Sequence, residues 1–253
     1  MSITLLDYIY SGIATFFGEM FGCMFGGGSF FIQPALLAIG IPAKQAVAND
    51  VAAAIFSCAG FLLTSKYKPP NIAKITALTV PTAIIGAFTG GYILSQIAEH
   101  IVEFFIIGIC TLGLIHTFTH LKLKNALVVV EKEPSLYWKP ALMGAGLLIG
   151  LYNGISGAGS GTITIILLSL IMRKNMKTTI YMAICVTLVS ILAASASFAF
   201  HGLLNFKLLA FMIPGAFLGG IFAAKISTAL PESVLRFLYS LILGALIIYL
   251  LAA

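Results

Sequence analysis

Long runs of apolar residues follow one another along the chain, separated by short groups of charged residues, prolines and glycines. The runs lack the period-two alternation typical of a membrane β-barrel, so the pattern predicts helices. These breaks divide the chain into apolar segments, which we place at about 3–25, 29–43, 45–65, 72–96, 101–119, 140–158, 161–172, 178–200, 206–227 and 232–252. The pattern therefore predicts an all-α polytopic membrane protein of about ten helical segments.

Two of these segments are too short to cross a bilayer. Segments 29–43 and 161–172 fall well below the roughly 20 residues that a transmembrane helix needs. Each follows a glycine cluster, "GGGS" at 26–29 and "GAGSG" at 157–161. We therefore expect two short helices, each of them following a break in the backbone.

The two glycine clusters belong to an internal repeat. A shift of about 132 positions places "GEMFGCMFGGGS", from Gly18, over "GLYNGISGAGSG", from Gly150. With one further residue in the offset, "PTAIIGAFTGGYI" lies over "PGAFLGGIFAAKI". We expect a first membrane repeat at 1–120, a cytoplasmic connector at 121–139 and a second repeat at 140–253, together forming one membrane domain.

The loop charges indicate how the repeats are oriented. If each glycine cluster is the tip of a hairpin, the second half is inverted, and one face keeps only Lys44 and Lys207. The opposite face then receives Lys66, Lys68, Lys74, Lys122, Lys124, Lys132, Lys139, Arg173, Lys174, Lys177, Lys225 and Arg236. If each short segment instead continues the preceding one, the basic residues divide almost evenly. Because cytoplasmic loops are enriched in Lys and Arg, the hairpin model is favoured. In this model the basic face is cytoplasmic, and both termini lie on the extracytoplasmic side of the cell membrane.

Composition agrees with this picture. The chain has 253 residues, 60% of them hydrophobic and 9% charged, whereas soluble domains contain about 25% charged residues. The net charge of +6 arises from basic residues scattered in short loops, which argues against a nucleic-acid partner. The four cysteines each stand alone in an apolar run and are interpreted as small buried hydrophobes. The N-terminus has no basic region or cleavage site, so no signal peptide is expected.

The glycine breaks are the candidate substrate site. Transporters built from inverted repeats hold their substrate at discontinuous helices, and a helix N-terminus with free backbone N–H groups attracts anions. The predicted substrate-binding residues are Gly26, Gly27, Gly28, Ser29, Gln33, Asn49, Ser156, Gly159, Ser160, Gly161 and Thr162. The alternative is that the glycines only permit close helix packing.

Two carboxylates inside apolar segments are candidates for proton coupling. Ionisable groups are costly within a membrane, which makes Glu19 and Asp50 functional candidates. Asp50 has a second interpretation, as a carboxylate that satisfies N–H groups at the start of its helix. His116 and His120 are spaced i, i+4 without a third ligand nearby, so we predict no metal and no cofactor. No phosphate-binding loop or catalytic arrangement is present in the sequence, and we expect no enzyme.

These motifs carry a resemblance to a known family. The stretch "FGGGSFFIQPALLAIGIPAKQAVAND", with "GISGAGSGTITIILLSLIMRKNMKTTIYM" in the second half, resembles the TauE/SafE family of sulfite-exporter-like permeases over nearly the whole chain. The resemblance implies transport of small sulfur anions such as sulfite, sulfoacetate and related sulfonates, usually outward. The chain departs from the family pattern of a Gly-Thr or Thr-Ser pair early in the third segment, because it has Asn49-Asp50 and, in the second half, Tyr181-Met182.

Together these features predict a secondary transporter, an exporter of a small sulfur-containing anion by alternating access with proton coupling. Its partners would be the small anionic substrate and the lipid bilayer, and a homodimer stays an open alternative. The competing hypotheses are a passive channel or permease for another small organic anion or solute, and a structural scaffold. A channel would show a continuous polar stripe through several helices, whereas the polar residues concentrate at the two breaks.

Overall fold

The computed structural model describes residues 4–66, 68–69, 72–108, 138–172 and 176–226. Its labelled helices are α1 (Leu5–Phe25), α2 (Ser29–Ala38), α3 (Ala43–Thr64), α4 (Ile72–Gln96), α6 (Trp138–Ile155), α7 (Ser160–Met172), α8 (Met176–Phe200) and α9 (Phe206–Ile226). Residues 99–108 are helical as well, and every regular element within the described ranges is a helix. The predicted all-α class is confirmed. Most of the predicted segments 101–119 and 232–252, and nearly all of the connector 121–139, lie outside the described residues.

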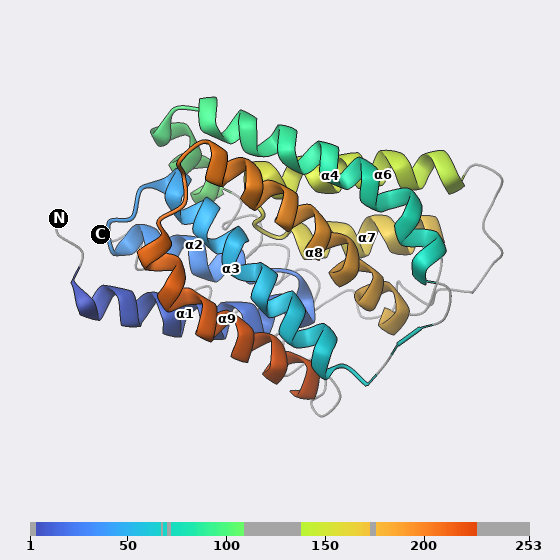
Figure 1. Cartoon of the computed structure of the whole chain (residues 1–253), viewed down its shortest axis with the longest axis horizontal. Coiled ribbons are helices and arrows are strands. Elements are labelled where there is room, and N and C mark those ends of the chain that lie inside the picture. The colour runs from blue at the N-terminus through green and yellow to red at the C-terminus, as the bar shows by residue number, and fades with distance from the viewer. Residues whose placement is uncertain (1–3, 67, 70–71, 109–137, 173–175, 227–253) are drawn as a thin grey trace.

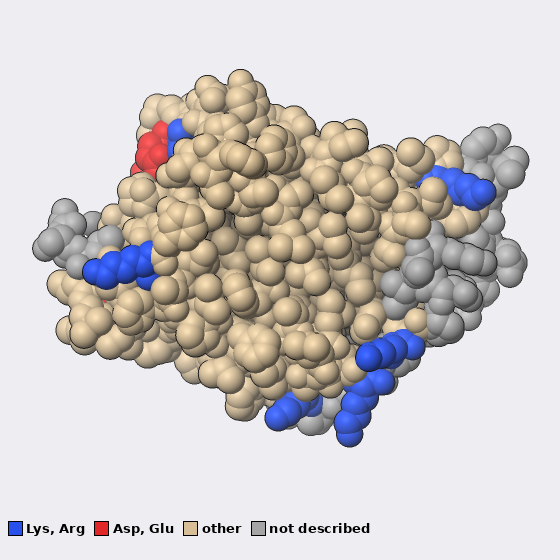
Figure 2. Space-filling model, viewed as in Figure 1, with Lys and Arg blue, Asp and Glu red and all other residues tan. Residues whose placement is uncertain are grey.

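Several helices have the length and apolar character of membrane spans. These stretches are Ala43–Thr64, Thr76–Gln96, Thr178–Phe200 and Phe206–Ile226, whereas α2 and α7 are shorter apolar helices. Figure 2 shows the visible Lys and Arg side chains at the left, right and lower margins of the molecule, around a broad uncharged surface. Large apolar side chains such as Ile85 and Leu148 are exposed. The protein is therefore a multi-pass membrane protein.

The first glycine cluster turns the chain back on itself. Helix α1 begins with a capping box between Thr4 and Asp7 and ends at Gly26, which has the left-handed φ of 82°. Helix α2 then runs back along α1, where a Cβ on Gly22 would lie 2.9 Å from the Gly28 Cα atom. Glycine at these positions is therefore required both by the turn and by the close approach of the two helices.

The second glycine cluster makes an equivalent hairpin. Gly157 and Gly159 have φ values of 67° and 71° in the turn between α6 and α7. Leu142, early in α6, packs with Leu168, late in α7, so the two helices run in opposite directions. In Figure 1, α1 starts at the end of the molecule where the N-terminus lies and α6 starts at the opposite end. The two predicted short helices after glycine breaks are thus present as opposed re-entrant hairpins.

Helix packing repeats between the halves. Helix α1 packs on α9 and α6 on α4, while α3 packs on α9 and α8 on α4. Small residues make these contacts close: a Cβ on Gly60 would lie 2.5 Å from the Phe217 carbonyl oxygen, and one on Gly91 would lie 2.7 Å from the Ser197 side chain. Helices α3 and α8 contact each other between the hairpins. This pairing is what two inverted repeats require, and the boundaries at 120 and 140 stay a prediction.

Candidate functional site

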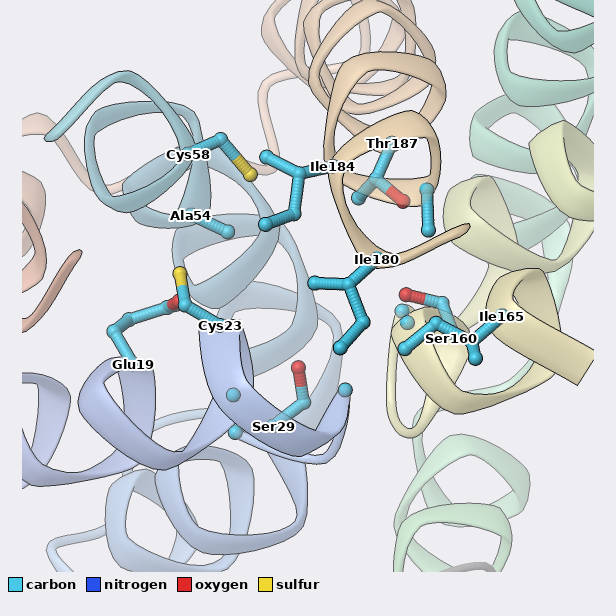
Figure 3. A pocket seen from close by; sticks show the side chains of 16 residues that line it. Glu19, Cys23, Ser29, Ala54, Cys58, Ser160, Ile165, Ile180, Ile184 and Thr187 are labelled. Carbon is cyan, nitrogen blue, oxygen red and sulfur yellow. The ribbon is translucent and has the colours of Figure 1, made fainter. Parts of the chain in front are cut away.

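A small cavity lies where the two hairpin tips meet α3 and α8. Its volume is about 70 Å³. Figure 3 shows side chains from these elements converging on a common space. The lining residues are Glu19, Gly22, Cys23, Gly26, Gly28, Ser29, Ala54, Cys58, Gly157, Ser160, Gly161, Ile165, Ile180, Ala183, Ile184 and Thr187. Both glycine clusters therefore contribute to one site, although more than 100 residues separate them.

The structure brings part of the predicted substrate site to the cavity wall. The predicted binding residues on the wall are Gly26, Gly28, Ser29, Ser160 and Gly161. The remaining ones, Gly27, Gln33, Asn49, Ser156, Gly159 and Thr162, do not line it. Among the coupling candidates, Glu19 lines the cavity and Asp50 does not. The role of all these residues in binding stays a prediction.

The hairpin tips touch each other through their backbones. The Thr162 N–H of the second tip donates to the Gly26 carbonyl oxygen of the first at 3.3 Å. Within the second tip, the Ser160 N–H donates to the Gly157 carbonyl oxygen at 3.1 Å. A Cβ on Gly161 would lie 2.5 Å from the Gly26 Cα atom. Because these N–H groups already have partners, the polar side of the cavity depends on the Ser29 and Ser160 hydroxyls and on the bare backbone of the neighbouring glycines.

Glu19 is the acidic group on the cavity wall. Its side chain is 5% exposed, and the Ser57 hydroxyl donates a hydrogen bond of 2.5 Å to its Oε2 atom. The buried thiols of Cys23 and Cys58 line the same part of the cavity. None of the residues that line the described cavity is Lys, Arg or His. Glu19 therefore lies in a buried site where no basic side chain on the wall balances its charge.

A second buried polar cluster lies behind the cavity. The Gln33 Nε2 atom donates to Asp50 Oδ2 at 2.9 Å and to the Ser156 carbonyl oxygen at 2.6 Å. The Asn49 side-chain amide donates to the Gln45 carbonyl oxygen of its own helix at 2.8 Å. Asp50 lies two turns inside α3, which begins at Ala43. The alternative of Asp50 as a helix cap is therefore not what the structure shows, because its carboxylate pairs with Gln33 across to α2.

Sequence reasoning missed one whole side of the cavity. Helix α8 supplies Ile180, Ile184 and Thr187, and the Thr187 Oγ1 atom is buried without a hydrogen-bond partner in the described structure. The offset that pairs Pro81 with Pro214 also pairs Ala54 with Thr187, so the repeat relates these two lining residues once the structure has placed one of them. The cysteines were missed as lining residues because a cysteine in an apolar run usually indicates core packing.

The two halves differ in one polar contact. Ser57 on α3 pairs with the Glu19 carboxylate of α1. Ser190, its equivalent on α8 under the same repeat offset, instead accepts a hydrogen bond of 2.8 Å from the Asn153 amide of α6. The two equivalent serines therefore have different partners, a carboxylate in one half and a neutral amide in the other.

The described residues offer little to a metal ion. They contain no group of three or more His, Cys, Asp or Glu side chains placed to hold one. His116 and His120 lie outside the described residues.

The fold and the cavity define a class: a polytopic membrane protein whose re-entrant hairpins meet around a buried cavity, as in secondary transporters. A family model described as "Sulfite exporter TauE/SafE" matches residues 11–250, and the chain belongs to this family. A relative named "Probable membrane transporter protein YdhB", from Bacillus subtilis (strain 168), is 24% identical over 254 residues, which cover 98% of this chain and 100% of the relative. No solved structure matches the chain. The resemblance inferred from the glycine motifs is confirmed.

Proposed function

We propose that the protein is a secondary transporter, not an enzyme, that exports a small sulfur-containing anion such as sulfite or an organosulfonate. Transport would occur by alternating access with proton coupling. The observation that carries the proposal is the cavity of about 70 Å³ enclosed by both hairpin tips. A site shared by two inverted repeats can be exposed first to one face and then to the other when one repeat rocks against its partner.

The cavity suits a compact anion. One water molecule needs about 10–15 Å³ of such volume, so the cavity of about 70 Å³ has room for a group of several heavy atoms. The Ser160 hydroxyl provides a neutral donor at one tip, and the Ser29 hydroxyl at the other tip also interacts with the Asp50 carboxylate. Ile180 and Ile184 close the opposite side. Neutral donors can bind an oxyanion without holding it as tightly as a cation would.

The distribution of charge supports an orientation in the cell membrane. Lys66 and Lys68 follow α3, and Lys225 lies in the last turn of α9, at the end of the molecule that the hairpin model assigns to the cytoplasm. Lys44 lies at the opposite end, where its ammonium group donates to the Ser95 carbonyl oxygen. In the proposed orientation both termini face outside the cytoplasm.

The test has two parts. Purified protein is heated with sulfite, sulfoacetate, thiosulfate, sulfate or short carboxylates, and a specific ligand raises the unfolding temperature by mass action. Proteoliposomes then report flux of the stabilising anion, which saturates for a transporter and rises linearly with concentration for a channel. Gly144→Ala, purified in parallel, should behave like the wild type in both measurements, since a Cβ there meets no atom within 4 Å. Absence of stabilisation by every sulfur anion would contradict the substrate class.

A further inference from the structure

We propose that Glu19 is the group that carries the coupled proton, and that it binds this proton together with the anion. Asp50, the other coupling candidate, would instead position Gln33, whose amide joins the two halves. This inference rests on the proposed function, because it names the coupling residue of the same cavity. It follows from where the two carboxylates lie, from the charges around them and from their hydrogen bonds.

The position of each carboxylate separates their roles. Glu19 lines the cavity, so a bound anion would contact or closely approach it. Asp50 is fully buried outside the lining, with its Oδ2 atom bonded to Gln33 and the lining residue Ser29 between its carboxylate and the cavity. A group that exchanges a proton as the cavity opens must reach the water in it, and among the lining residues Glu19 is the carboxylic acid.

Among the residues that the structure describes, the charged and titratable groups around Glu19 do not stabilise a second negative charge. Its own helix contributes Cys23, α3 contributes Asp50 and Cys58, and α8 contributes Cys185 near the thiol of Cys58. Helices α2 and α7 contain no titratable side chain. In α9, the ammonium groups of Lys207 and Lys225 lie over the rings of Tyr8 and Phe222 near the two helix ends.

An anion and an ionised Glu19 therefore compete for the same small volume. Two negative charges a few ångströms apart repel strongly in a medium of low dielectric constant. When the Glu19 carboxylate binds a proton it becomes a neutral acid, and its remaining hydrogen-bonding capacity can serve the anion or Ser57. The anion should consequently bind to the protonated form, and proton and anion should cross and leave together.

Co-movement has a consequence for the direction of transport. One proton moving with a divalent oxyanion leaves one net negative charge to cross the membrane. A membrane potential that is negative inside favours the outward movement of that charge. Proton co-transport of a divalent oxyanion is therefore compatible with the proposed export.

Asp50 has the contacts of a structural group. Through Gln33 it connects α3 to α2, and Gln33 also bonds the Ser156 carbonyl oxygen at the second hairpin tip. An asparagine at position 50 would keep an oxygen to accept from Gln33. Asp50→Asn is therefore a matched counterpart of Glu19→Gln, since both replace a buried carboxylate by its isosteric amide.

The experiment measures anion affinity against pH. The probe is methanesulfonate, whose charge is constant between pH 5.5 and 8, and its affinity for the purified protein is obtained from the unfolding temperature. One linked proton predicts that the wild-type affinity falls about tenfold per pH unit above the Glu19 transition. Glu19→Gln should bind with an affinity independent of pH, whereas Asp50→Asn should keep the wild-type slope.

The outcomes distinguish this inference from the proposed function. Binding without a pH slope in the wild type, a slope that persists in Glu19→Gln, or a slope lost in Asp50→Asn would each overturn the inference alone. No binding of methanesulfonate, sulfate or sulfite at any pH would overturn the proposed function and, with it, this inference. If Glu19→Gln does not fold, proton uptake on adding methanesulfonate is measured in weakly buffered solutions of the wild type and of Asp50→Asn. One proton per anion in both proteins supports the inference, and absence of uptake in either protein overturns it.

Discussion

The Gln33 amide donates a hydrogen bond of 2.6 Å to the Ser156 carbonyl oxygen. The bond joins the short helix of the first hairpin to the turn of the second, across 123 residues of sequence. Any motion that separates the two hairpin tips must break it. The bond is therefore expected to stabilise the conformation in which the tips enclose the cavity.

Replacing Gln33 by leucine should destabilise the protein. Gln33→Leu keeps a side chain of similar size but leaves the Asp50 Oδ2 atom and the Ser156 carbonyl oxygen without this donor, at a cost of about 1–3 kcal/mol for each unsatisfied buried group. Chemical denaturation of the purified protein measures the change. Gln96→Leu is the matched control, since Gln96 is exposed and bonds to the neighbouring Ser95 hydroxyl. Equal losses for both variants would contradict the role of Gln33.

Two glycines with the same backbone conformation should respond differently to alanine. Gly26 has φ 82° and Gly40 has φ 80°, so Ala strains the backbone by about 1–2 kcal/mol at each. A Cβ on Gly26 would also lie 2.9 Å from the Gly161 Cα atom, whereas one on Gly40 meets nothing within 4 Å. Gly26→Ala should therefore lose anion flux in proteoliposomes and Gly40→Ala should retain most of it. Similar flux in the two variants would show that the contact between the tips is dispensable.

The cavity thiols should report substrate binding. Cys23 and Cys58 line the cavity and are buried, whereas Cys185 is half-buried and does not line it. With all other cysteines replaced by alanine, a small methanethiosulfonate reagent should modify Cys23 or Cys58 several-fold more slowly when the bound anion fills the site. Mass spectrometry measures the rates, and Cys185 in the same background is the control. Equal protection of all three thiols would indicate a global effect of the anion on stability.

The proposed orientation predicts opposite labelling of two exposed lysine positions. Lys68 follows α3 and Lys207 begins α9, and both side chains are exposed. In intact cells a membrane-impermeant maleimide should label Lys207→Cys and should label Lys68→Cys only after the membrane is permeabilised, both in a background without other cysteines. The reverse pattern would overturn the orientation inferred from the loop charges.

Much of the architecture was predictable because its determinants are local or repeated along the chain. Apolar segment length separates full spans from short helices, and glycine clusters mark the breaks, as at Gly26 and Gly159. The positive-inside rule added the relative orientation of the hairpins, since it constrains each loop independently of how the helices pack. Opposed hairpins near the middle of the molecule followed from these signals together.

The composition of the cavity wall was less predictable. Gly28 and Ser160 could be expected there because each stands at a glycine break, but Ile184 and Thr187 lie inside a helix whose polar and apolar residues follow no one-sided pattern. Which face of such a helix meets the cavity depends on its rotation, and that rotation is set by packing against neighbours. Gln33 and Asn49 were assigned to the substrate site from their polarity, and the structure places them away from the wall.

The sequence by itself determined the class of protein, the two glycine breaks and their inverted arrangement, because hydropathy, loop charge and backbone flexibility act over short stretches. The tertiary structure decided which carboxylate reaches the cavity. Glu19 and Asp50 are both acidic residues within apolar segments, and they differ only in what packs around them: Glu19 faces the space between the tips, and Asp50 is covered and paired with Gln33. That difference arises from contacts between helices far apart in the chain, which a linear pattern does not encode residue by residue.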